Sequence, residues 1–207
     1  MRNELVWFAL SFGMVMAVLG GASLLYRLKM VSAQTSRKLI HIGVAHWIFF
    51  VPLFDSLWVA MMAPVAFVFL NALSQRFRIV KSMEREDKHD YGTVWYALVL
   101  SIITYVSFTT QVFTPAFVAM MILGWGDGVA TLVGLRVSSP LLRPGKSLAG
   151  SAVVAAAALI TGLVFVPSPW LMVQLVLVAV NAELFAPKGL DNVTIGLLPF
   201  LLVWLYV

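Results

Sequence analysis

The chain has 207 residues, of which 61% are hydrophobic and 11% are charged, and it contains no cysteine. Soluble domains carry about a quarter charged residues, so this composition excludes a soluble globular protein and indicates an integral membrane protein. The absence of cysteine excludes disulfides and thiolate metal sites. In a membrane protein, the net charge of +5 is expected to orient the chain in the bilayer and to bind anionic phosphate groups. We expect no nucleic-acid binding.

Apolar stretches bounded by charge or by Pro and Gly predict the membrane spans. Helices are expected throughout, because lipid cannot satisfy an open strand edge. The first stretch is too long for a signal-peptide core, so we expect a retained span. The predicted fold is an all-α, polytopic helix bundle of about eight spans, with seven as the alternative count, forming a single transmembrane domain over residues 1–207. In chain order the predicted spans are 5–26, 39–54, 57–74, 94–110, 115–135, 149–166, 169–185 and 193–207.

Positive charge falls on one side of these spans. Of the 14 Lys and Arg residues, only Arg2 lies outside the first, third, fifth and seventh loops. The positive-inside rule makes these loops cytoplasmic, so both termini are expected outside. An odd number of spans would spoil this segregation of positive charge, so we prefer eight spans. We therefore expect a multi-pass membrane protein whose polar residues face the cytoplasm. The expected location is a prokaryotic plasma membrane.

Arg37, Lys38 and His41 open the second predicted span and can share one helical face. Phosphate binding and topogenic charge explain the two cations equally well. His41 is a candidate general base, although a hydrogen-bonded structural histidine is the commoner use of such a residue. His46 has no suitably spaced ligand partner and is expected to be structural.

Residues 75–93 form the longest polar stretch and are expected to be a cytoplasmic interfacial loop. Its mixed charges are most simply explained by a solvated helix at the membrane surface. At its end, Gly92 and Thr93 supply a flexible backbone and a hydroxyl that could contact a nucleotide or its phosphates.

Asp127 is a carboxylate among glycines in the apolar segment MILGWGDGVATLVG. An ionisable residue at membrane depth is costly and persists mainly where it faces a cavity, a partner or an ion. Mg²⁺ takes oxygen ligands, often one or two carboxylates plus phosphate oxygens, so Asp127 is a candidate Mg²⁺ ligand. The alternative is an ion pair with a basic residue of another span. Gly126, Ala130 and Gly134 recur every four residues and predict close packing of another helix.

The basic turn from Arg143 to Ser147 precedes the sixth predicted span and is followed by Gly150 and Ser151. Gly145, Lys146 and hydroxyl groups at a helix N-terminus could form an anion cradle, because free N–H groups and the helix dipole point outward there. The turn is not a Walker A loop, since the required first glycine would fall at Pro140. A phosphate site and an interfacial basic turn both fit this spacing.

Glu183 and the pair Asp191–Asn192 flank the short turn between the last two predicted spans. The hairpin can bring the two acids together. Beside Asp127, they could complete a metal site with two or three carboxylates. An acid at the start of a helix is also an ordinary cap, which is the alternative for Asp191.

Five motifs follow one another from Arg37 to Ile195: RKLIHIG, DYGTVWYAL, GDGVATLVG, GKSLAGS and AELFAPKGLDNVTI. Their order resembles the CTP-dependent lipid-alcohol kinase family, which includes dolichol kinase, phytol kinase and a CTP-dependent diacylglycerol kinase and is distantly related to phosphatidate cytidylyltransferases. The chain departs from the family pattern at Ala149, where relatives often have a glutamate, at Leu190, where some have a second acid, and at Leu135, which separates the usual Gly-Arg pair.

The resemblance implies transfer of the γ-phosphate of CTP to a membrane-resident lipid alcohol, with Mg²⁺ as cofactor. The acceptor would be a prenol such as phytol, geranylgeraniol or farnesol, or diacylglycerol. The implied metal ligands are Asp127, Glu183 and Asp191, and the implied catalytic residues are these three with Lys146 and His41. The residues implied for nucleotide or phosphate binding are Arg37, Lys38, Gly92, Thr93, Gly126, Gly128, Gly145, Lys146, Ser147 and Asn192.

Two other functions fit parts of this pattern. Cytidylyl transfer onto a lipid phosphate is the nearest alternative, and the short chain favours the kinase. A small transporter is the second, but its polar residues would gather at the midplane, whereas here they crowd one face and show no half-to-half symmetry. A non-catalytic scaffold would not need Asp127, Glu183 and Asp191 together.

Overall fold

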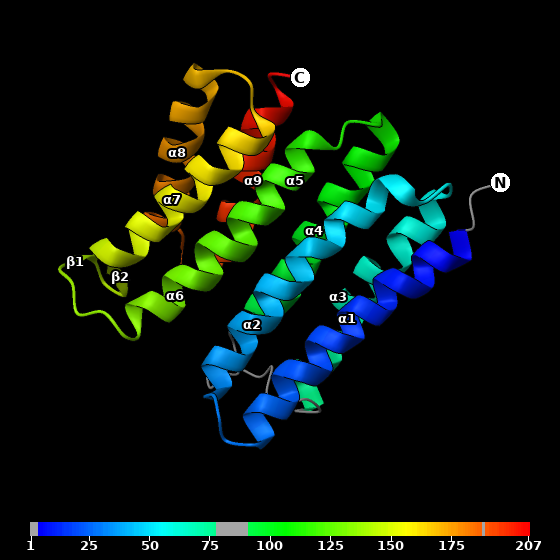
Figure 1. Ribbon diagram of the computed structural model, residues 1–207, viewed down its shortest axis with the longest axis horizontal. Helices are drawn as coiled ribbons and strands as arrows, with labels where there is room; N and C mark the ends of the chain where they lie inside the picture. The colour runs from blue at the N-terminus through cyan, green and yellow to red at the C-terminus, as the bar shows by residue number, and fades with distance from the viewer. Residues whose placement is uncertain (1–3, 78–90, 188) are drawn as a thin grey trace. The chain divides into compact units, whose positions relative to one another are not determined.

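The computed structural model describes residues 4–77, 91–187 and 189–207, which are almost entirely helical (Figure 1). The all-α class predicted from the apolar stretches is confirmed. The chain divides into two compact units, Met1–Gln111 (unit 1) and Val112–Val207 (unit 2), and each is described by itself. The expectation of one catalytic domain over the whole chain stays a prediction.

Unit 1 contains four predicted spans, and each lies on helix. Its elements are α1 (Glu4–Arg27), α2 (Ala33–Ala45), the 3-10 helix η1 (His46–Leu53), α3 (Leu57–Phe77) and α4 (Gly92–Thr110). The second helix begins earlier than predicted because Ser32 is its N-cap, with Ser32 Oγ accepting from Thr35 N at 3.1 Å.

Helices α1 and α2 approach closely where Gly43 faces Val18. A Cβ added at Gly43 would lie 2.5 Å from Val18 Cγ1, so no larger residue fits without movement. The buried hydroxyl of Ser36 also donates to the Ala22 carbonyl oxygen across this contact, at 3.0 Å. Small residues thus allow the two helices to pack, as in other membrane helix pairs.

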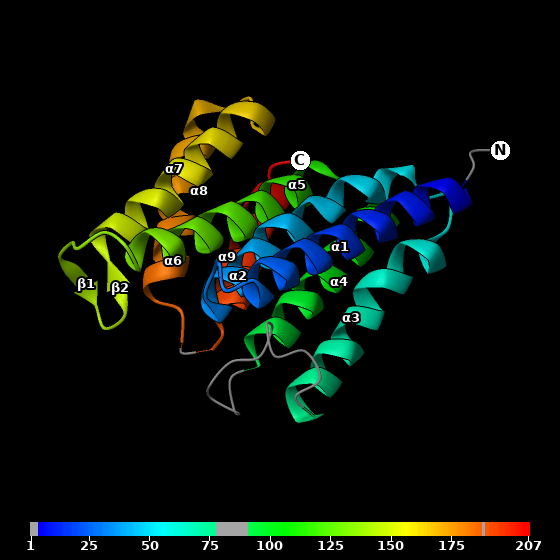
Figure 2. The ribbon, with the colours of Figure 1, turned by 60° about the horizontal axis from the view of Figure 1, so that its bottom comes forward.

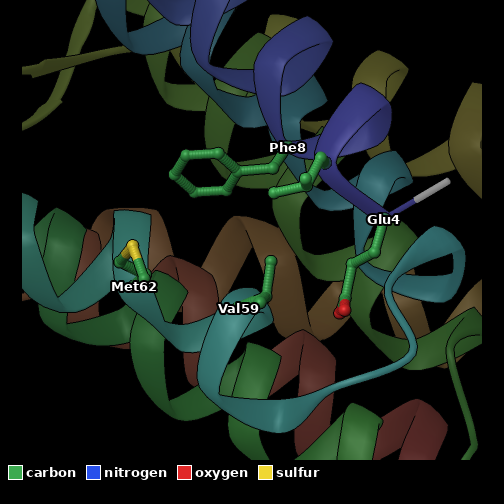
Figure 3. A pocket seen from close by; sticks show the side chains of 5 residues that line it. Glu4, Phe8, Val59 and Met62 are labelled. Carbon is green, nitrogen blue, oxygen red and sulfur yellow. The ribbon is translucent and has the colours of Figure 1, made fainter.

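The start of α1 caps α3. Glu4 Oε1 accepts from the backbone N–H groups of Asp55 and Ser56, at 3.1 and 2.8 Å, just before α3 begins. A carboxylate is stabilising near a helix N-terminus, so this contact favours the start of α3. An apolar recess beside this contact is lined by Glu4, Leu5, Phe8, Val59 and Met62 (Figure 3).

Unit 2 begins with one long apolar segment that changes its helical pitch. The elements α5 (Thr114–Met121), π-helix η2 (Ile122–Asp127) and α6 (Gly128–Gly134) together cover the predicted span 115–135. It continues through α7 (Leu148–Phe165), α8 (Pro169–Leu184) and α9 (Asp191–Trp204). Single-turn π-helices occur often at functional sites, and this one ends at Asp127.

A short β-ribbon joins α6 to α7, and no strand was predicted there. β1 (Leu141–Arg143) pairs antiparallel with β2 (Lys146–Ser147), with Arg143 opposite Lys146. Figures 1 and 2 show this ribbon just beyond the ends of α6 and α7. The turn requires Gly145, whose φ of 76° is unfavourable for other residues. Open strand edges are excluded only within lipid. The ribbon lies after the apolar segment, and most of its residues are exposed.

Within the described ranges, five helices are long and apolar enough to cross a membrane: α1, α3, α4, the segment Thr114–Gly134 and α7. α8 and α9 are shorter apolar helices. These lengths support an integral membrane protein, while the span count and the side of the termini stay predictions. Of the predicted loop 75–93, its first residues belong to α3 and Gly92 begins α4. Arg2, residues 78–90 and Lys188, which contribute to the predicted sidedness, lie outside the described residues.

Candidate active site

Asp127 is buried at the end of the π-helix, with 4% of its surface exposed. Its backbone carbonyl oxygen accepts from Thr131 Oγ1 at 3.0 Å. Gly126 and Gly128, predicted to contact nucleotide, are also buried. Because η2 packs against α7 and α9, the carboxylate belongs to the helix-packed interior of unit 2.

The predicted small-residue stripe packs against α7. A Cβ at Gly126 would lie 3.7 Å from Ala157 Cβ, and one at Gly150 would lie 3.6 Å from the Ala130 carbonyl oxygen. Gly134 lies near Ser147 Oγ, the N-cap of α7. The packing interpretation of these glycines is therefore confirmed, and it brings the start of α7 beside α6.

The predicted anion cradle of free N–H groups does not form at the start of α7. Leu148 N donates to the Pro140 carbonyl oxygen at 2.9 Å, and Ala149 N donates to Ser139 Oγ at 3.1 Å. Gly150 N donates to the N-cap oxygen, Ser147 Oγ, at 3.2 Å. Three amides that a phosphate would need are thus already bonded within the chain, so side chains must supply any anion binding here.

Lys146, Glu183 and Ser151 form a hydrogen-bonded network from β2, α8 and α7. Lys146 Nζ lies 2.9 Å from Glu183 Oε1, and Ser151 Oγ donates to Glu183 Oε2 at 3.1 Å. The Glu183 side chain is 6% exposed and that of Lys146 is 23% exposed. Both carboxylate oxygens are therefore bonded, and the charge of a buried acid is balanced by a lysine that still reaches solvent.

A second contact holds the ribbon against α8. The guanidinium carbon of Arg143 lies 4.6 Å from the ring centroid of Phe185, the residue that follows α8. Arg143 and Lys146 are paired across the ribbon. Two cations of one turn therefore contact the end of one helix, by a cation–π contact and by an ion pair.

Asp191 and Asn192 begin α9, close in the chain to the end of α8. Asp191 Oδ1 accepts from Asn192 N at 3.1 Å, although the N-cap position belongs to Leu190. Asn192 is buried. Thr194 Oγ1 donates to the Ala182 carbonyl oxygen at 3.1 Å, which ties the start of α9 to the residue before Glu183. The hairpin thus places the two acidic motifs at the same end of unit 2, as predicted.

The remaining predicted residues lie in unit 1. Tyr96 Oη donates to the His41 carbonyl oxygen at 3.0 Å, and the two rings lie 4.2 Å apart between centroids. Asn71 Nδ2 donates to the Thr93 carbonyl oxygen at 3.1 Å and joins α3 to the first turn of α4. His41 and the Gly92–Thr93 turn are therefore linked through α4, with Arg37 and Lys38 in the preceding turn of α2.

His46 has the structural role that was predicted for it. Its Nδ1 lies 2.9 Å from the Ile42 carbonyl oxygen, one helical turn earlier. The predicted base His41 is instead in contact with Tyr96, so its position is fixed from a second helix.

No family model matches the chain, and none of the solved structures matches it. A curated relative is a phytol kinase of Synechocystis sp., which is 30% identical over 204 residues, covering 91% of this chain and 86% of the relative. The chain belongs to the family of lipid-alcohol kinases that includes phytol kinase. The resemblance drawn from the five motifs is thereby confirmed.

The family resemblance implies Mg²⁺, so the acidic side chains of unit 2 were compared with the ligands that this ion needs. Among the described residues, no three His, Asp or Glu side chains gather at a spacing that would hold a metal ion. Glu183 is bonded to Lys146 and Ser151, and the only other acids in the sequence of unit 2 are Asp127 and Asp191. The described side chains therefore form no three-carboxylate site, and Asp127 and Asp191 are the acids of unit 2 left as candidates for a metal that completes its shell with phosphate oxygens.

Three contacts of the predicted residues were not foreseen, two in unit 2 and one in unit 1. Ser151 stands in the GKSLAGS motif as a small hydroxyl, and its bond to Glu183 depends on the packing of α7 against α8. Phe185 and Tyr96 are aromatic residues inside the quoted motifs, which was the available signal for both. Their partners, Arg143 and His41, come from other elements that only the fold brings near.

Proposed function

We propose that the protein is an integral membrane kinase that transfers the γ-phosphate of CTP to the hydroxyl of a lipid alcohol at the cytoplasmic membrane face. The observation that carries this proposal is the relationship to phytol kinase over 91% of the chain. The apolar helices and the polar network of unit 2 support it, because such a reaction needs a membrane-resident acceptor beside charged, phosphate-binding groups.

Lys146 is the residue of unit 2 best placed to bind phosphate. It lies in β2, two residues before α7 begins, its ammonium has three donors, and 23% of its side chain is exposed. Ser147 follows it, and Gly145 provides the turn that presents it. Asn192 is the further candidate for nucleotide binding in unit 2, while Arg37, Lys38, Gly92 and Thr93 are the candidates that unit 1 offers.

Asp127 and Asp191 are the proposed Mg²⁺ ligands. The metal would neutralise phosphate charge as the phosphoryl group moves, which is the main requirement of this chemistry. Gly126 and Gly128, which flank Asp127, are proposed nucleotide-binding residues. The proposed acceptor of the hydroxyl proton is a carboxylate of this set or His41.

The proposed acceptor is a prenol such as phytol, geranylgeraniol or farnesol, with diacylglycerol as the other lipid alcohol to be tested. The phytol kinase relative supports the prenol. A long-chain alcohol would arrive laterally from the bilayer, while the nucleotide would arrive from the cytoplasm.

A donor-label experiment tests the reaction. Purified protein in lipid nanodiscs receives Mg²⁺ and a nucleotide, either CTP labelled at the α- or the γ-phosphate or ATP labelled at the γ-phosphate. Separate reactions contain a prenol, diacylglycerol or phosphatidate. The proposal expects γ-label in the prenol product. Transfer of α-label to phosphatidate would show that the protein is a cytidylyltransferase and not a kinase. Transfer of γ-label from ATP but not from CTP would show that ATP is the donor.

A further inference from the structure

The charge of Lys146 is balanced inside the protein before any nucleotide is present. Its Nζ lies 2.9 Å from Glu183 Oε1, and Glu183 Oε2 accepts from Ser151 Oγ at 3.1 Å. A lysine in a close ion pair is a weaker phosphate ligand than a lysine in water, since the phosphate must compete with the carboxylate. If Lys146 serves the nucleotide, this ion pair opposes binding.

Burial makes the two partners unequal. Glu183 has 6% of its side chain exposed and cannot follow Lys146 into solvent, whereas Lys146 is 23% exposed on a flexible stem in a two-residue strand. The lysine is therefore the partner that can move. Its departure would leave a buried carboxylate, which is costly unless another donor stays with it.

Ser151 is that donor. It is buried on α7, one turn after the N-cap Ser147, and its hydroxyl points to the carboxylate oxygen that Lys146 does not use. Ser151 can keep its bond to Glu183 while Lys146 leaves, because the two donors occupy different oxygens.

We propose that Lys146 exchanges partners, binding Glu183 in the nucleotide-free protein and the phosphates of a nucleotide when one enters, and that Ser151 is a positioning residue that stabilises Glu183 during the exchange. This inference rests on the proposed kinase function. It assigns Glu183 to the control of nucleotide affinity and not to metal binding.

Equilibrium binding of labelled CTP with Mg²⁺, measured in nanodiscs without any acceptor, tests the exchange. Glu183→Gln removes the competing charge and keeps the shape, so it should lower the dissociation constant about threefold to tenfold. Ser151→Ala should raise it about tenfold, because the bound state would then contain a buried carboxylate without its hydroxyl donor. Ser151→Thr keeps the hydroxyl and should restore most of the affinity.

A double-mutant cycle separates this role from general packing. If Ser151 acts through Glu183, Ser151→Ala should have little effect on CTP binding in the Glu183→Gln background. Thr161→Val, which removes another buried hydroxyl of α7, is the matched control and should leave binding unchanged. Melting temperatures of all variants identify any that fail to fold.

Two results would overturn the exchange. One is weaker CTP binding by Glu183→Gln with a shifted Mg²⁺ requirement, which would make Glu183 a metal ligand. The other is an equal effect of Ser151→Ala in both backgrounds. If the wild-type protein still transfers γ-label, either result removes only this inference, whereas a wild-type protein that binds no CTP overturns the CTP-kinase proposal as well.

Discussion

Lys146 and Glu183 form an ion pair between a solvent-reaching turn and the buried end of a helix, with 2.9 Å between Nζ and Oε1. The pair joins the β-ribbon to the end of α8 within unit 2. Its two charges are unequal in exposure, so replacing one partner is not equivalent to replacing the other.

Lys146→Met should impair both stability and nucleotide use. Removing the ammonium leaves Glu183 buried with Ser151 alone, which should cost about 2 kcal/mol, less than for a fully buried pair because Lys146 is partly exposed. The Michaelis constant for CTP should rise at least about tenfold, by loss of a charged phosphate contact. Thermal melting and initial rates check the two effects, and Lys146→Arg, which keeps the charge, is the control. Unchanged CTP kinetics in the Met variant would remove Lys146 from the phosphate site.

Gly43→Ala should loosen the contact of α1 with α2. The added Cβ would lie 2.5 Å from Val18 Cγ1, so Val18 or the helix must shift, at a cost of about 1–3 kcal/mol. The melting temperature should fall accordingly. Val18→Ala in the same chain should recover part of the loss by making room. Gly13→Ala, where a Cβ meets nothing within 4 Å, is the matched control. Equal melting of the two single variants would show that α1 and α2 do not pack at Gly43.

Tyr96→Phe should have a modest effect. It removes the 3.0 Å hydrogen bond to the His41 carbonyl oxygen and keeps the ring that lies against the imidazole. Loss of one such bond costs about 1 kcal/mol. Tyr96→Ala should be worse, because it also removes the ring contact and leaves a cavity. Melting temperatures in the order wild type, Phe, Ala check this account; a Phe variant as unstable as Ala would place the whole effect on the hydroxyl.

Much of the fold follows from the sequence, and the reasons are local. Apolar stretches of helical length predicted every helix of the described ranges, because lipid leaves the backbone few alternatives. The predicted start of the second span, at residue 39, was too late: α2 begins at Ala33, where Ser32 caps it, and a serine before a helix is a signal that the prediction did not use.

The β-ribbon and the ion pair of Lys146 with Glu183 could not be predicted in the same way. Strands of three and two residues carry no alternation, and the amides at the start of α7 find partners at Ser139 and Pro140 that only the folded turn supplies. The sequence put Lys146, Glu183 and Asp127 on one predicted side of the membrane. It did not show that Glu183 would bind the lysine and Ser151, because α7 and α8 must first pack.

The most direct measurement is transfer of label from the γ-phosphate of CTP to phytol by the protein in nanodiscs with Mg²⁺, with Asp127→Asn run beside the wild type. The account predicts labelled phytyl phosphate from the wild type and at least about a hundredfold less from Asp127→Asn, because a neutral amide binds Mg²⁺ and its phosphates far more weakly. Asp55→Asn, an exposed acid of unit 1, should behave as the wild type. An Asp127→Asn protein with wild-type rates would contradict the metal assignment, and a wild-type protein that transfers no label to any lipid alcohol, from CTP or from ATP, would contradict the kinase itself.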